Sequence, residues 1–62
     1  MDYTRLVCTG HDKDGRWFKV KLETTAVPKH GAISRSLVKA MVDAELLRSG
    51  FKSSRDLSII RY

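Results

Sequence analysis

Hydrophobic residues recur at a helical period in one part of this sequence, between Ile33 and Phe51. At about 100° per residue, six of their side chains fall within about 120° of one another, as in a helix that lies on a core. They are Ile33, Leu37, Ala40, Met41, Ala44 and Leu47. We therefore predict a helix that packs on the rest of the domain through this stripe.

The ends of this helix are also indicated by the sequence. Ser34 or Ser36 can cap its start, because a serine hydroxyl accepts a hydrogen bond from a free backbone N–H of the first turn. Gly50 can take the left-handed conformation that commonly follows a helix, and Phe51 can then fold back onto the last turn. The helix is expected to end at Arg48 or Ser49.

A second apolar ridge lies roughly opposite the first stripe. It consists of Val38, Val42 and Leu46, spaced i, i+4 and i+8. A helix with two apolar sides needs two partners, so this ridge meets the C-terminal segment of the chain, a second copy in a homodimer, or another protein. We interpret it as a candidate partner-binding surface.

Three segments have the composition of strands. Between Arg16 and Thr25 polar and apolar residues alternate, with Phe18, Val20 and Leu22 on one side. The opposite side carries Trp17, Lys19, Lys21 and Glu23. Tyr3–Thr9 is rich in β-branched and aromatic residues, and Asp56–Tyr62 is a plausible last strand.

Turn-forming residues separate these segments and indicate their arrangement along the chain. A glycine-bounded polar stretch, Gly10–Gly15, predicts a hairpin, whereas Pro28 excludes an ordinary central strand before the helix. The order is strand, strand, helix, strand. It predicts an α+β fold: a small two-layer domain whose antiparallel sheet of two to three strands has one helix packed on one face.

Length and composition limit what the chain can be. Sixty-two residues, of which 42% are hydrophobic and 31% charged, make a single small domain over 1–62. A single cysteine, Cys8, excludes an internal disulfide and a cysteine-based zinc site. With neither a membrane-length apolar run nor a signal-peptide pattern, we expect a cytoplasmic protein that does not enter membranes and uses no cofactor.

The net charge of +5 changes the functional picture, because it favours an acidic partner, either nucleic acid or an acidic protein surface. On the predicted sheet face away from the helix, Trp17, Lys19 and Lys21 would join Tyr3, Arg5 and Val7. Aromatic rings between cations can stack unpaired bases while the cations hold phosphates. The alternative is a solvated strand face on which the tryptophan covers the alkyl stems of its neighbours.

Two histidines are candidates for chemistry, although neither has metal-ligand spacing and no metal site is expected. His11 has the intrinsic pKa of a general base, and Gly10 beside it would let a substrate approach; a solvated surface residue is the alternative. Lys29 and His30 precede the helix start, where free N–H groups favour an anion, and Arg35 follows one turn later. These residues can bind a phosphate, or simply form a polar turn.

Val27–Gly31, followed by Ser36–Met41 and preceded by Gly10 and His11, resembles the HicA toxins of toxin–antitoxin pairs. These are small basic messenger-RNA interferases with a fold like the double-stranded-RNA-binding domain. The resemblance spans roughly residues 5–47. It implies that His11 is the catalytic base and that Lys29, His30 and Arg35 contact RNA.

Two functions follow from the sequence. The first is a small basic nucleic-acid-binding module, with RNA as the expected ligand and a HicA-like ribonuclease activity as its extension. The alternative is a small regulator or inhibitor that binds a larger protein through the ridge of Val38, Val42 and Leu46. A small-molecule enzyme is disfavoured, because so short a chain can hardly enclose a substrate pocket and keep a core.

Overall fold

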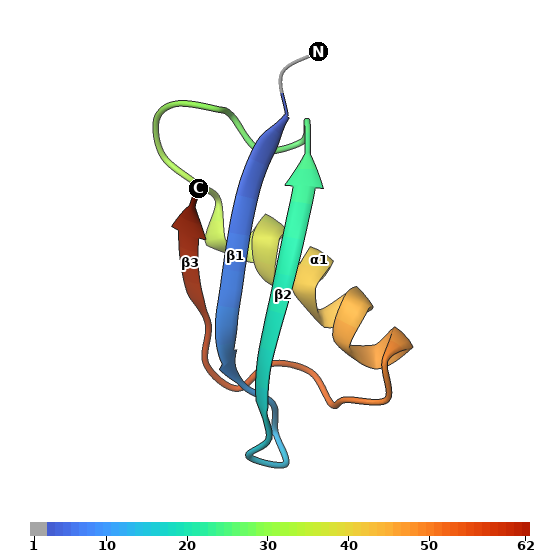
Figure 1. Ribbon diagram of the computed structural model, residues 1–62. Coiled ribbons are helices and arrows are strands. Elements are labelled where there is room, and N and C mark those ends of the chain that lie inside the picture. The colour runs from blue at the N-terminus through green and yellow to red at the C-terminus, as the bar shows by residue number, and fades with distance from the viewer. Residues whose placement is uncertain (1–2) are drawn as a thin grey trace.

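The computed structural model describes residues 3–62 and contains an antiparallel three-stranded sheet with a helix behind it (Figure 1). The elements follow the chain in the order β1 (Thr4–His11), β2 (Trp17–Thr24), α1 (Arg35–Arg48) and β3 (Ser58–Arg61). The strand order in the sheet is β2-β1-β3, which makes β1 the central strand. The predicted α+β class and the predicted order of elements are confirmed.

A tight turn joins β1 to β2. The backbone N–H of Asp12 donates to the carbonyl of Arg16 at 2.9 Å, and the N–H of Gly15 donates back to the carbonyl of Asp12 at 2.9 Å. Gly15 has φ of 81°, so a type I turn is followed by a left-handed glycine, a common three-residue hairpin connection. The predicted hairpin is therefore present, with its glycine where positive φ is required.

The core lies between α1 and one face of the sheet. The alternation predicted for β2 is confirmed, because Phe18 and Leu22 are buried and Val20 packs against the same cluster. The complete set of buried hydrophobic residues is Leu6, Cys8, Phe18, Leu22, Val27, Val38, Val42 and Leu46. Three of these eight come from the helix, and they are the second ridge.

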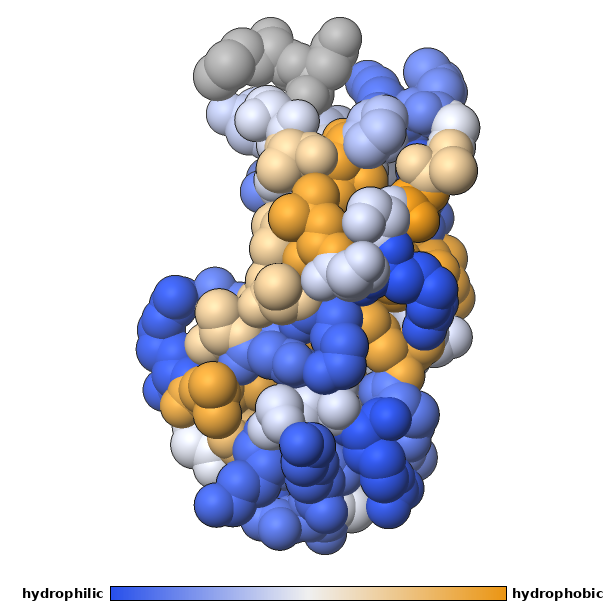
Figure 2. Space-filling view, turned by 180° about the vertical axis from the view of Figure 1, so that it is seen from behind, coloured by the Kyte–Doolittle hydropathy of each residue, from blue (hydrophilic) through white to orange (hydrophobic). Residues whose placement is uncertain are grey.

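The prediction of the helix face was therefore wrong. Val42 is fully buried, whereas Leu37 and Leu47 of the first stripe are 39% and 61% exposed. Val38 and Leu46 are buried with Val42, so these three residues form core packing and not a partner-binding or homodimer surface. Figure 2, seen from the helix side, shows the hydrophobic surface that this arrangement leaves uncovered.

Polar contacts beside the ridge show why this face turns inward. The Asp43 carboxylate accepts hydrogen bonds from the backbone N–H and the hydroxyl of Ser54, at 2.9 and 2.7 Å. At the other end of the helix, the Arg35 guanidinium donates to the carbonyl of Leu57 at 2.5 Å. These three hydrogen bonds attach α1 to the segment that leads into β3, and they favour this rotation of the helix about its axis.

The ends of α1 agree with the sequence. The hydroxyl of Ser34 accepts from the N–H of Leu37 at 3.4 Å, so Ser34 is the N-cap. At the other end, Gly50 has φ of 85° and the N–H of Phe51 donates to the carbonyl of Leu46 at 2.9 Å. This 6→1 bond is the Schellman motif, which satisfies carbonyls of the last turn.

Candidate nucleic-acid interface

One face of the sheet has no layer on it within residues 3–62, since α1 lies on the other side (Figure 1). The register aligns alternate residues across this open face: Trp17 lies opposite His11, Lys19 opposite Thr9 and Lys21 opposite Val7. On the far side of β1, Ile60 lies opposite Val7, and the N–H of Tyr62 donates to the carbonyl of Arg5 at 3.1 Å. The residues that the sequence assigned to this face do share it.

Exposed aromatic rings lie at both ends of the open face, with cations between them and beside them. Trp17 is 60% exposed, Tyr62 57% and Tyr3 47%, so all three rings are accessible to a ligand. The cations are Arg5, Lys19 and Lys21, all of them exposed. The only carboxylate among the described residues at these register positions is Glu23, opposite Arg5. The face is therefore net positive and has aromatic surface at both ends of the sheet.

His11 ends β1 beside the turn, where Asp56 holds it. The Asp56 carboxylate accepts the backbone N–H of His11 at 3.0 Å, and its other oxygen lies 3.4 Å from His11 Nδ1. Within residues 3–62 no hydrogen bond engages Nε2 of this histidine. The imidazole side chain is 44% exposed and has the carboxylate beside Nδ1.

Gly10 serves a different purpose from the one that the sequence suggested. A Cβ atom at this position would overlap the backbone carbonyl oxygen of Asp56 and lie 2.7 Å from its Oδ1. The space on the Cβ side of Gly10 is thus filled by Asp56, the residue beside His11. Asp56 had been assigned only to a strand, and no sequence pattern indicated its contact with a residue 45 positions away.

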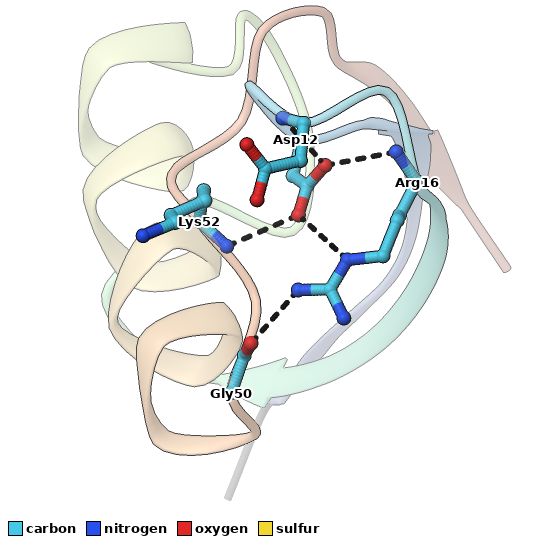
Figure 3. Close-up of polar contacts among 5 residues, drawn as sticks. Asp12, Arg16, Gly50 and Lys52 are labelled. Carbon is cyan, nitrogen blue, oxygen red and sulfur yellow. Dashed lines mark hydrogen bonds and ion pairs between the residues drawn. The ribbon is translucent and has the colours of Figure 1, made fainter.

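Asp12 anchors the turn that carries His11 and Trp17 (Figure 3). Its side chain is 0% exposed, and each oxygen has two donors. Oδ1 accepts the backbone N–H groups of Asp14 and Arg16, at 3.0 and 2.9 Å. Oδ2 accepts the N–H of Lys52 at 3.1 Å and lies 3.4 Å from Arg16 Nε.

These donors determine the ionisation of Asp12. Burial raises the pKa of its carboxyl, but the three backbone N–H groups and the Arg16 guanidinium lower it more, so the pKa lies below its usual value. The same guanidinium donates to the carbonyl of Gly50 at 2.8 Å and stacks 4.4 Å from the Phe51 ring centroid. Asp12 and Arg16 thus join the hairpin to the end of α1. Asp and Gly three residues apart are typical of a type I turn, and that was the available sequence signal.

The residues predicted to form a phosphate site, in the connector between β2 and α1 and at the start of α1, are divided between two places. Lys29 and His30 line hollows at the end of the sheet together with Arg5 and Tyr62. Arg35 lines a different hollow, with Lys39 and Arg55. The single phosphate site predicted from these residues is therefore not assembled as expected, although Arg5 joins Lys29 and His30. His11 lies at the opposite end of β1, roughly 20 Å along the strand from Arg5.

Comparisons with known proteins do not identify a relative. No family model, curated protein or solved structure matches the chain. The resemblance to HicA toxins remains a prediction from short motifs. Among residues 3–62, no group of three His, Cys, Asp or Glu side chains is arranged to hold a metal ion. The one helix of the described chain is too short and too polar to span a membrane.

Proposed function

We propose that this protein binds single-stranded nucleic acid, RNA in particular, through the open face of its sheet. The observation that supports this function is the placement of three exposed aromatic rings among three cations on one uncovered surface. Bases stack on the rings, and Lys19 and Lys21 neutralise the backbone between them. A duplex has its bases stacked inside and offers them poorly to such a face, so single strands bind more tightly.

The test is a titration with fluorescent single- and double-stranded RNA and DNA of one sequence, at two salt concentrations. Affinity for the single strands should fall steeply as salt rises, because bound cations release counterions from the phosphates. Trp17→Ala should weaken binding by about 1–3 kcal/mol if a base stacks on its ring, and Trp17→Phe should retain most of the affinity.

Leu47→Ala is the matched control for this titration, since Leu47 is equally exposed but lies on the helix side. It should not change the affinity. Binding that is insensitive to salt, or that weakens equally in Leu47→Ala and Trp17→Ala, contradicts the proposed interface.

The His11–Asp56 pair supports a second candidate function, RNA cleavage, which is also what the HicA resemblance implies. In this reaction Nε2 of His11 accepts the proton of a 2′-hydroxyl, and the 2′-oxygen attacks the adjacent phosphorus. The P–O bond to the 5′-oxygen breaks, and water protonates the leaving oxygen. Asp56 stabilises the imidazolium that forms, since it lies 3.4 Å from Nδ1.

Cleavage is tested separately from binding. His11→Ala should abolish RNA fragments on a gel while single-strand affinity changes by no more than a few fold. DNA of the same sequence lacks the 2′-hydroxyl and should remain intact. Equal cleavage by the purified wild type and by His11→Ala would assign the activity to a contaminant or to other residues.

A further inference from the structure

The outer edge of β2 has no neighbouring strand among the described residues, since the sheet order is β2-β1-β3. The N–H of Asp12 donates to the carbonyl of Arg16, and this pair continues the register of β1 and β2. Hydrogen-bonded and non-hydrogen-bonded pairs alternate in an antiparallel ladder, so the even-numbered residues of β2 bond to β1. The backbone N–H and C=O groups of the odd-numbered residues therefore point away from the sheet. These residues are Trp17, Lys19, Lys21 and Glu23.

This edge is the more accessible of the two edges of the sheet. Within residues 3–62 no hydrogen bond engages the outward backbone groups of β2, which is eight residues long. β3 has only four residues, and its Arg61 donates to the carbonyls of Pro28 and Gly31 in the connector. The connector therefore lies beside β3, whereas an extended chain can approach β2. A row of unpaired N–H and C=O groups is a template for pairing with another strand.

A groove of about 460 Å³ lies beside this edge, between β2 and the end of α1. Its apolar lining comes from Phe18 and Val20 of β2, from Leu46 and from Phe51. In Figure 1, α1 crosses behind the sheet and its C-terminal end extends beyond β2. A strand added to β2 would lie about 4.8 Å from it and would still have the end of the helix behind it. Apolar side chains on that side of the added strand would enter the groove.

The other side of the edge carries two lysines without an acidic partner across the ladder. Lys19 lies opposite Thr9 and Lys21 opposite Val7 in the register with β1, and both lysines are exposed. Among the described residues no ion pair engages either of them. An added strand would therefore meet two positive charges on its open-face side.

Two carboxylates near the edge are compensated by other cations. Glu23 lies opposite Arg5 in the register, and Glu45, which lines the groove, lies 2.7 Å from Arg48. With both lysines included, four cations therefore stand against two carboxylates along this edge. The edge favours an acidic partner.

We propose that the outer edge of β2 binds an extended acidic segment of another protein, which adds to the sheet as a fourth, antiparallel strand. Alternate side chains of a strand point to opposite faces, so apolar residues of the partner enter the groove and acidic residues between them lie beside Lys19 and Lys21. A second copy fits less well, because two β2 strands paired around Val20 place Lys19 of each against Lys21 of the other. This inference goes beyond nucleic-acid binding and does not depend on it.

The experiment measures fluorescence anisotropy of a labelled short peptide of alternating glutamate and valine, without nucleic acid. In an antiparallel pair the peptide residues opposite Lys19 and Lys21 have their side chains on the same face and turn their N–H groups toward β2. These residues are the glutamates. Methylating the glutamate nitrogens should weaken binding at least about tenfold, because several backbone hydrogen bonds are lost. Methylating the valine nitrogens instead is the matched control and should change the affinity little.

Two charge reversals in the protein localise the peptide. Lys21→Glu should weaken the glutamate peptide at least about fivefold, because like charges then face each other across the new pair. Lys13→Glu changes the net charge equally, but Lys13 lies in the turn and does not line the groove. It should leave the affinity within about twofold, since salt screens a distant exposed charge. Thermal melts establish that both variants are folded.

Each other result contradicts a defined part of the proposal. If the peptide does not bind, or if the two methylated peptides lose affinity equally, the added strand is refuted. If a peptide of alternating lysine and valine binds the wild type as tightly, the acidic partner is refuted. If the protein alone sediments as a dimer and the peptide does not bind, a second copy occupies the edge and the acidic partner is again refuted.

Discussion

Val42→Asp should unfold this domain, although Val42 belongs to the ridge that the sequence assigned to a partner. Its side chain is fully buried between α1 and the sheet. Removing a buried valine side chain costs about 1.5–3 kcal/mol, and an unpaired buried carboxylate costs several kcal/mol more. A chain of 62 residues is stabilised by roughly 3–9 kcal/mol in total. The substitution therefore removes most or all of the stability.

The assay is far-UV circular dichroism during thermal or urea unfolding, with two comparison variants. Val42→Ala should lower the free energy of unfolding by about 2 kcal/mol, which for so small a domain corresponds to about 8–16 °C in Tm. Leu47→Asp places the same carboxylate on the other side of the helix, where Leu47 is 61% exposed. It should cost no more than about 1 kcal/mol, mainly through the helix dipole.

The reverse pattern would refute this assignment of the faces. If Val42→Asp melts like the wild type and Leu47→Asp is unfolded, the first stripe is the core face and the ridge is free. If both variants are unfolded, an additional layer covers Leu47, and the search for a partner should begin at the first stripe.

Three further predictions concern the residues that hold the hairpin and the helix. Burial raises the pKa of Asp12, but its hydrogen bonds and the Arg16 guanidinium lower it below its usual value, so the stabilisation is present above the usual carboxyl pKa and is lost as the pH falls through the lowered one; urea unfolding at pH 6, 4 and 3 should show this decline, and a smaller one in Asp12→Asn. Gly10→Ala should destabilise the domain by several kcal/mol, because the added methyl overlaps the Asp56 carbonyl; a melt no lower than that of the wild type would exclude this close packing. Gly50→Ala should lower the free energy of unfolding by only about 1–2 kcal/mol, because alanine is strained at a positive φ but its methyl group would meet no neighbouring atom; an unchanged Tm would show that the helix end rearranges.

Local signals in the sequence predicted the elements well. Alternation in β2, the glycine of the hairpin and the left-handed Gly50 each express a preference of a few neighbouring residues, and each is present in the structure. The last strand is shorter than predicted, at Ser58–Arg61, because Asp56 contacts His11 and the Leu57 carbonyl accepts from Arg35 of α1.

The helix face was predicted wrongly because α1 has apolar residues on two sides. The first stripe has more members, but Ala40 and Ala44 contribute little area, whereas Val38, Val42 and Leu46 are fully or almost fully buried. Periodicity shows which residues share a side and not which side meets the sheet. That choice depends on contacts such as Asp43 with Ser54, which the spacing of apolar residues does not include.

Local patterns in the sequence predicted part of the candidate site, but not the contacts between residues that are distant in the chain. Alternation along β2 was enough to place Trp17, Lys19 and Lys21 on one face. The partner of His11 was not predictable, since Asp56 lies 45 positions away in the chain and contacts it only through the tertiary fold. The separation of Arg35 from Lys29 and His30 likewise depends on the tertiary fold, namely on how the connector between β2 and α1 lies beside the end of the sheet.

The reactivity of the buried Cys8 thiol can report when the structure around it opens. Cys8 lies in the central strand with no exposed surface, and burial raises the pKa of its thiol. Thiol reagents react with the thiolate, so they modify this cysteine only when α1 or a neighbouring strand moves away from it. The labelling rate, divided by that of the denatured chain, therefore measures how often the core around Cys8 opens. A ligand that binds across β1, β2 and β3 should slow labelling in proportion to its occupancy, without any tag added to the protein.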